Sequence, residues 1–73
     1  MIFAAEVKSY DEVNNTFPTE YLIVCGDSFA EAAKEIEEYY GPTLESVALQ
    51  YLESGDQLVQ ISKEQYKEFI ENA

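Results

Sequence analysis

The stretch that decides the fold is CGDSFAEAAKEIEEYYGP, residues 25–42, because it carries the start signal, the apolar stripe and the stop signal of one helix. Ser28 and Glu31 form the capping pattern S-x-x-E, and Gly41 followed by Pro42 is typical of the end of a helix. Apolar residues recur between these signals at helical spacing, at Phe29, Ala32, Ala33, Ile36, Tyr39 and Tyr40. The sequence therefore predicts an amphipathic helix between Ser28 and Gly41.

The residues before this helix predict two β-strands. Residues 2–12 alternate, so that Phe3, Ala5 and Val7 lie on one side of a strand. Residues 19–26, TEYLIVCG, are dense in β-forming residues with little alternation, which predicts a central strand buried on both faces. Because the connecting segment NNTFP contains turn-forming residues, we expect the two strands to form a hairpin.

The residues after the helix repeat the same plan. Residues 44–53 alternate as a strand, and residues 57–61 predict a short strand beyond a tight SGD turn. Residues 62–72 open with a second capping box, Ser62 to Gln65, and predict a short C-terminal helix.

Together these elements predict a single α+β domain over residues 1–73, in the order ββαββα. We expect a four-stranded, antiparallel-rich sheet with the long helix on one face. The other face would carry apolar side chains, namely those of Ile2, Ala4, Tyr10, Leu22, Val24, Ala48, Leu52 and Leu58. Three alternatives remain open for that face: the short helix covers it, a second copy of the chain covers it, or another protein does.

The charge of the chain limits the partners that it can bind. The formal net charge is −11 at pH 7, with 4 basic residues and no histidine. Direct binding to nucleic acid or to an anionic membrane is not expected, because both need clustered Lys or Arg. A protein partner with a basic surface is compatible with this charge, and so is solubility alone. No signal peptide or transmembrane segment is recognised, and a single cysteine indicates a reducing compartment, so we expect a cytoplasmic location.

The sequence offers no set of residues with catalytic, cofactor-binding or metal-binding spacing. Cys25 precedes a helix start, which can activate a thiol, but neither histidine nor arginine is present to assist it. We therefore expect Cys25 to be a buried structural thiol. The acidic pairs Asp11 and Glu12, or Asp27 and Glu31, lack the loop pattern of a calcium site, and zinc would need His or more Cys. The expectation is a protein that is not an enzyme and binds no cofactor or metal.

Three glutamates form an outward ridge on the predicted helix. Glu31, Glu35 and Glu38 follow one another at i, i+4 and i+7, and Glu37 lies on their flank. Like charges at this spacing weaken a helix by a few tenths of a kcal/mol, and one nearby lysine does not offset them. The distance between neighbours, about 5–6 Å, is of the same order as phosphate spacing on nucleic acid. Two interpretations follow: a DNA-mimicking surface, or ordinary solvated acids in an acidic protein.

Tyrosines are the second group of interface candidates. Tyrosine is enriched in the residues that dominate binding energy at protein interfaces, but it is also common in the half-buried positions of small sheet proteins. Among the six tyrosines, Tyr39 and Tyr10 are the two that we assign to an interface. The predicted partner-binding residues are thus Glu31, Glu35, Glu37, Glu38, Tyr39 and Tyr10.

The segment TEYLIVCGDSFAEAAKEIEEYYG, residues 19–41, resembles a run common in short phage and mobile-element proteins of unknown function. In those proteins a strand passes through DSF-EA into an amphipathic helix. The size and acidity of the chain also resemble phage-encoded inhibitors of host defence, including anti-CRISPR and anti-restriction proteins that mimic nucleic acid. This second resemblance is one of composition, and it assigns no residue. It implies a protein that acts in the cytoplasm of a host cell.

Two functions follow as expectations. The first is a non-enzymatic protein-binding module, a phage-type inhibitor that presents its acidic surface to a host nucleic-acid-binding or defence enzyme. The alternative is a small phage accessory or assembly protein that dimerises, or docks on a partner, through the apolar sheet face.

Overall fold

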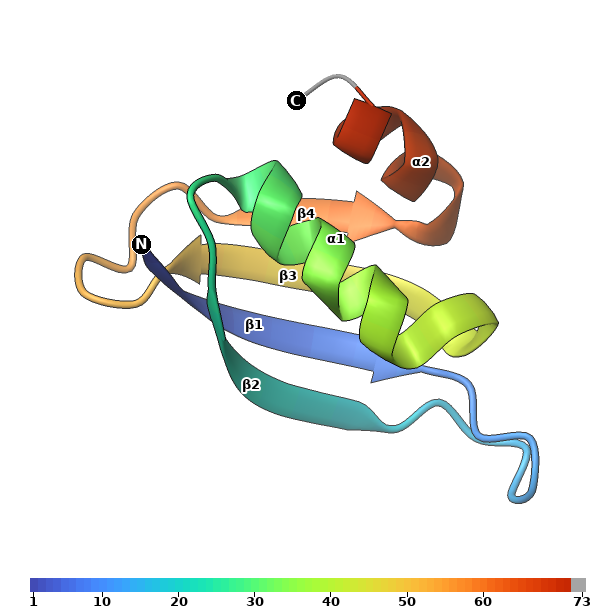
Figure 1. The fold of residues 1–73 in the computed structure, drawn as a ribbon. Helices are drawn as coiled ribbons and strands as arrows, with labels where there is room; N and C mark the ends of the chain where they lie inside the picture. Colours follow the sequence, from blue (N-terminus) through green and yellow to red (C-terminus); the bar gives the residue numbers. More distant parts are fainter. Residues whose placement is uncertain (72–73) are drawn as a thin grey trace.

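The computed structural model describes residues 1–71 and has two layers, a four-stranded sheet and a layer of helices (Figure 1). The elements are β1 (Ile2–Ser9), β2 (Thr19–Cys25), α1 (Phe29–Tyr40), the 3₁₀ helix η1 (Gly41–Thr43), β3 (Leu44–Tyr51), β4 (Val59–Ser62) and α2 (Lys63–Glu71). The predicted α+β class and the order ββαββα are therefore confirmed.

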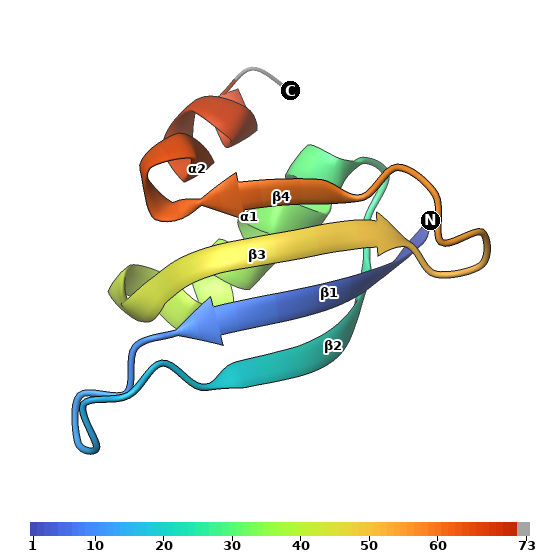
Figure 2. The same ribbon diagram turned by 180° about the vertical axis from the view of Figure 1, so that it is seen from behind.

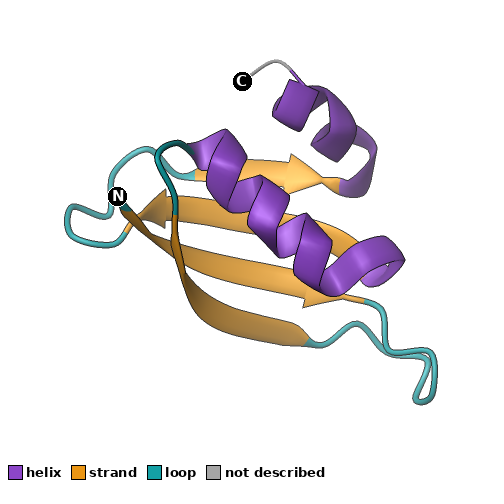
Figure 3. Cartoon of the chain, in the orientation of Figure 1, coloured by secondary structure: helices purple, strands orange, loops and turns teal. Residues whose placement is uncertain are grey.

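The sheet is antiparallel throughout, with the strand order β2-β1-β3-β4 (Figure 3). The prediction that residues 19–26 form a central strand buried on both faces is wrong, because β2 lies at one edge of the sheet. The centre is formed by β1 and β3, which pair with each other from Phe3 opposite Tyr51 to Ser9 opposite Leu44. A density of β-forming residues is compatible with an edge strand as well as with a central one, so composition alone misplaced this strand.

The core lies between the sheet and α1. The side chains of Phe3, Val7 and Leu49 are fully buried on the helix-facing side of the two central strands. Three aromatic rings close one end of this core, where Phe29 of α1 lies 4.9 Å from Phe3 and 4.9 Å from Tyr51, centroid to centroid. From α1 the residues buried in the core cluster are Ala32, Ala33 and Ile36. The predicted apolar stripe of the helix thus faces the sheet, because burying it stabilises both layers.

Both ends of α1 follow the signals in the sequence. Ser28 Oγ accepts a hydrogen bond from the Glu31 N–H at 3.2 Å, and Glu31 Oε2 accepts one from the Asp27 N–H at 3.3 Å. Gly41 has a φ of +63°, a conformation that suits glycine, and its N–H donates to the Glu37 carbonyl. Pro42 lies in the 3₁₀ turn η1 that follows, so α1 itself ends at Tyr40, as predicted, and one short helical turn comes after it.

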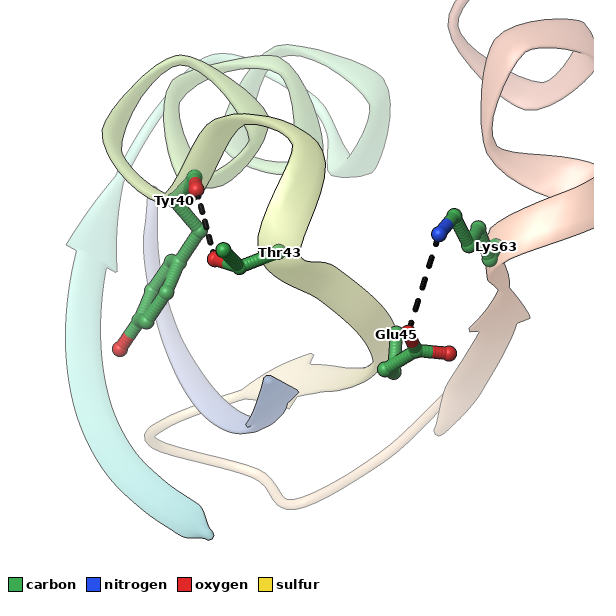
Figure 4. Close-up of polar contacts among 4 residues, drawn as sticks. All are labelled: Tyr40, Thr43, Glu45 and Lys63. Carbon is green, nitrogen blue, oxygen red and sulfur yellow. Dashed lines mark hydrogen bonds and ion pairs between the residues drawn. The ribbon is translucent and has the colours of Figure 1, made fainter. Parts of the chain in front are cut away.

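Helix α2 lies on the same side of the sheet as α1, next to β4 (Figures 1 and 2). Its Tyr66 is buried and donates a hydrogen bond from its hydroxyl to the Ala33 carbonyl of α1. An ion pair of 3.7 Å between Lys63 and Glu45 also ties α2 to the start of β3 (Figure 4). The alternative in which the short helix folds over the second sheet face is therefore wrong. Residue 72, the last residue of the predicted helix, lies outside the described residues.

The first predicted strand ends earlier than its alternation suggested. β1 stops at Ser9 and not at residue 12, and its pairing with β3 shifts between Lys8 and Ser9. The chain then forms a loop that is closed by an isolated bridge between Asp11 and Thr16. Asp11 accepts hydrogen bonds from the Asn14 side chain and from backbone N–H groups of the loop, which hold its pKa below the usual range.

Candidate interaction surface

The outward side of α1 presents Glu31, Glu35 and Glu38 to solvent, as the predicted ridge requires. Among residues 1–71, one ion pair between side chains is formed, and it joins Lys63 to Glu45. The three glutamates of the ridge form no ion pair within these residues. Glu31 has a structural task as well, because its carboxylate caps the N-terminus of the helix. The ridge is therefore a row of carboxylates that the protein itself does not neutralise.

A groove of about 610 Å³ runs between α1 and the edge strand β2. Its apolar floor is formed by Leu22 and Val24 of β2 together with Ile36 of α1. The remaining side chains of its lining include those of Glu20, Glu35, Glu38 and Tyr39. Three of the predicted interface residues, Glu35, Glu38 and Tyr39, thus meet in one groove.

Glu37 belongs to a different part of the surface. It is half-buried and lines a hollow between α1 and α2, together with Lys63 and Tyr66. Burial raises the pKa of the Tyr66 hydroxyl, and the negative charge of Glu37 raises it further. Glu37 therefore influences the contact between the helices, and the structure does not bring it to the groove.

The two predicted interface tyrosines lie in separate places. Tyr39 is 82% exposed at the end of α1, where its ring packs edge-on against Tyr40 at 5.1 Å. Tyr10 lies in the loop between β1 and β2, where its ring packs on Phe17 at 5.2 Å and its hydroxyl donates to Asn15 Oδ1 at 2.8 Å. Tyr10 thus organises this loop, and it does not line the groove with Tyr39.

Two residues near the groove were missed by the sequence analysis. The Tyr40 hydroxyl donates a hydrogen bond of 3.1 Å to Glu20 Oε1 and so links the end of α1 to β2. Burial, followed by this bond and the charge of Glu20, raises the pKa of Tyr40 to about 12. The Tyr40 carbonyl also accepts a hydrogen bond from Thr43 Oγ1 at 2.8 Å (Figure 4). The signal that could have found Glu20 is its spacing of two from Leu22, which places both side chains on one face.

The second sheet face is not covered by any described element, as Figure 2 shows from that side. The register places Tyr21, Ile23 and Cys25 on this face beside Glu6, Ala4 and Ile2. The sequence analysis had assigned Leu22 and Val24 to it, which is wrong, because Val24 lies opposite the buried Phe3 on the helix side. Cys25 is exposed, so its prediction as a buried thiol is also wrong.

The open face has an apolar end and a polar end. Ile2, Ile23 and Leu52 are exposed large apolar residues near the first residues of β1. The opposite end carries polar and charged residues, namely Glu6, Lys8, Thr19, Ser46, Gln60 and Ser62. The apolar end is the part of this face that suits a protein contact.

No group of three or more His, Cys, Asp or Glu side chains in residues 1–71 is arranged to hold a metal ion. Neither helix of the described part of the chain has the length and apolar character needed to cross a membrane. Comparison with protein-family models, with curated proteins and with solved structures finds no match to this chain.

Proposed function

We propose that the protein is a non-enzymatic binding module that occupies a basic, nucleic-acid-binding surface of another protein. Glu31, Glu35 and Glu38 of α1 take the place of nucleic-acid phosphates at that surface. The resemblance to phage inhibitors points to a host nucleic-acid-binding or defence enzyme as the target, and to the host cytoplasm as the place of action.

The observation that carries this proposal is the row of exposed carboxylates on α1 that no described lysine pairs with. Like charges at this helical spacing cost a few tenths of a kcal/mol of helix stability, and mixed charges would give solubility without that cost. The net charge of −11 adds long-range attraction to a basic partner, which speeds association at low salt.

Displacement of proteins from immobilised DNA tests the proposal. Proteins of a bacterial lysate are bound to DNA-cellulose, and the purified protein is then added at about 50 mM and at about 200 mM salt. We expect wild type to elute a restricted set of basic proteins at the lower salt concentration and far less at the higher one. The variant that combines Glu31→Gln, Glu35→Gln and Glu38→Gln should elute little at either concentration. Glutamine at position 31 keeps a capping side chain, so the helix start is preserved.

A matched control separates the ridge from net charge. Glu53→Gln, Glu64→Gln and Glu68→Gln together remove the same charge from exposed positions of the β3–β4 connection and α2. The control variant should elute the same proteins as wild type. Equal loss of elution in both triple variants would show that only net charge acts, and the proposal would be wrong.

A second candidate function rests on the open sheet face. The exposed Ile2, Ile23 and Leu52 favour an accessory protein that dimerises or docks through this face, with its acids serving solubility. Such a contact would survive high salt, because apolar burial does not depend on charge attraction. Sedimentation equilibrium at micromolar concentration and about 0.5 M salt checks it, since a monomer there would rule out self-association through this face.

A further inference from the structure

The hydrogen-bond pattern of the β1–β2 ladder fixes which backbone groups of β2 point away from the sheet. At its two ends the Ser9 N–H donates to the Pro18 carbonyl at 3.2 Å, and the Gly26 N–H donates to the Met1 carbonyl at 3.1 Å. Bonded pairs alternate along an antiparallel ladder, so the residues of β2 that bond to β1 are every second one between these ends. These residues are Glu20, Leu22 and Val24.

The other residues of β2 direct their N–H and C=O groups outward. They are Thr19, Tyr21, Ile23 and Cys25. Within residues 1–71, no hydrogen bond to the backbone of these four residues is formed by any other element. The outer edge of β2 is therefore a row of open donors and acceptors, in the arrangement that pairs with another strand.

The two edges of the sheet differ in how well they are protected. β4 is a short edge of 4 residues, and α2 packs beside it. β2 has 7 residues, TEYLIVC, with neither proline nor lysine among them. Short length, covering elements, charged side chains and proline are the usual protections of an edge strand. Of these β2 has one, the charge of Glu20, which lines the groove and opposes an acidic strand but not a basic one.

A strand added along the outer edge of β2 would direct every second side chain toward α1 and into the groove. The groove lining determines which type of side chain fits there. Its floor is apolar, formed by Leu22, Val24 and Ile36, and the carboxylates Glu35 and Glu38 line its helix side. A lysine or arginine fits both parts, because its methylene stem packs on apolar atoms while its charged end reaches a carboxylate.

The opposite side of the same added strand would meet the open sheet face. Tyr21 and Ile23 are 77% and 69% exposed there. Cross-strand pairs with aromatic and β-branched residues favour apolar side chains in the neighbouring strand. The sequence of the added strand must therefore alternate between basic residues, which face the groove, and apolar residues, which face Tyr21 and Ile23.

We propose that β2 accepts an extended segment of the partner protein as a fifth strand, with basic residues facing the groove and apolar residues facing Tyr21 and Ile23. This inference rests on the basic partner of the proposed function and adds the way in which that partner is held. The backbone of β2 supplies the hydrogen bonds, and the groove selects the charge.

A second copy of the chain fits this edge less well than a basic strand. Pairing β2 with β2 of another copy would bring two grooves together, and each groove contains Glu20, Glu35 and Glu38. It would also bring together two chains that each have a net charge of −11. Repulsion between them opposes association, whereas a cationic strand gains the corresponding attraction. The charge of the groove therefore favours a foreign basic segment.

Peptides of defined sequence test the proposal directly. The probe is a heptapeptide of alternating Lys and Val with blocked ends, and its match is the same peptide with Glu in place of Lys. A third peptide carries N-methyl groups on the residues that pair with Tyr21 and Ile23, which keeps the charge and removes the donors. We expect the Lys/Val peptide to bind and to slow amide hydrogen exchange at Tyr21, Ile23 and Cys25. The N-methyl peptide should bind at least tenfold more weakly, since it lacks two hydrogen bonds of about 1 kcal/mol each.

Variants of the protein give an independent test. Ile23→Pro removes one outward N–H but no bond to β1, and proline is tolerated at such edge positions. Ile23→Ala is the matched control, because it shortens the same side chain and keeps the N–H. We expect the alanine variant to bind the Lys/Val peptide more weakly than wild type, because it loses side-chain contact with the added strand. The proline variant should bind more weakly still, because it also loses a backbone donor, with circular dichroism confirming that both are folded.

The outcomes separate this proposal from the proposed function. Binding that is unaffected by N-methylation and by Ile23→Pro overturns strand addition, and displacement of proteins from DNA by the ridge would still stand. Equal binding of the Glu/Val peptide overturns the charge selection of the groove. A dimer in sedimentation that Ile23→Pro dissociates would show that a second copy occupies the edge, which also overturns the proposal. If both proposals hold, the ridge variant loses DNA displacement and also binds the Lys/Val peptide more weakly, because Glu35 and Glu38 belong to the ridge and to the groove. Intact peptide binding in that variant would overturn the charge selection of the groove.

Discussion

The two faces of the sheet differ in the burial of their apolar side chains. Those on one face form the core, and those on the other remain exposed to solvent and can contact a partner. On the helix side, Phe3, Val7 and Leu49 are fully buried against α1 and its neighbours. On the open side, Tyr21 and Ile23 are as apolar in type but remain exposed. Because both faces are drawn from the same strands, residue type alone does not separate them. What separates them is the position of the two helices, which pack on one face only.

The largest expected difference between the faces is in the cost of removing an apolar side chain. Leu49→Ala on the helix side should lower the free energy of unfolding by about 2–5 kcal/mol, through lost burial and a residual cavity. A domain of this size is expected to have about 4–11 kcal/mol in total, so this variant loses a large part of its stability. Ile23→Ala on the open side should change it by less than about 0.5 kcal/mol. Urea unfolding followed by circular dichroism measures both.

Similar losses in the two variants would contradict the comparison. They would mean that Ile23 is buried in solution, for example by a second copy of the chain. Repeating the unfolding of Ile23→Ala at two protein concentrations distinguishes these cases, because the stability of a dimer depends on concentration and that of a monomer does not.

The contact between the two helices supplies a smaller test of the covered face. Tyr66→Phe keeps the buried ring and removes the hydroxyl that donates to the Ala33 carbonyl of α1. We expect a loss of about 1 kcal/mol, the usual net value of one hydrogen bond, because the carbonyl still has its place in the helix ladder. Tyr21→Phe on the open face is the matched control and should have no measurable effect. Thermal unfolding of the three proteins side by side gives the comparison, and a neutral Tyr66→Phe would show that α2 is held by its apolar contacts alone.

The sequence was sufficient to predict the order of helices and strands and the helix-facing side of β1. Capping signals and helical spacing are local, so α1 and both of its ends could be predicted from residues close together in the chain. The alternation of Phe3, Ala5 and Val7 likewise identified the buried side of β1. In β2, both sets of alternating residues are apolar, so periodicity could not tell which set faces the helix. β2 lies at the edge because the other side of β1 pairs with β3, a strand distant in the sequence, and no local pattern encodes that pairing.

The candidate site was predicted in part for the same reason. The ridge of Glu31, Glu35 and Glu38 follows from spacing along one helix, and the structure leaves all three exposed. The groove depends on how α1 and β2 are placed side by side, so the contact of Glu20 with Tyr40 and the open edge could not be found from either element alone. Glu37 was placed beside the ridge by sequence, but its contacts are with the hollow between the helices.

The last expected effect concerns the rim where α1 meets β2, and it depends on pH. The pKa of Tyr40 is raised from about 10 in the unfolded chain to about 12 in the folded protein, by burial and by the hydrogen bond to Glu20. Between these two values the unfolded chain releases the proton and the folded protein keeps it, so stability falls as pH rises. The contribution is complete below pH 10 and is lost by about pH 12. Urea unfolding of wild type and Tyr40→Phe at intervals from pH 8 to pH 11 measures it, with the exposed Tyr21→Phe as the control. We expect a shallower fall for Tyr40→Phe only, and parallel curves for wild type and Tyr40→Phe would show that Tyr40 is not held against β2.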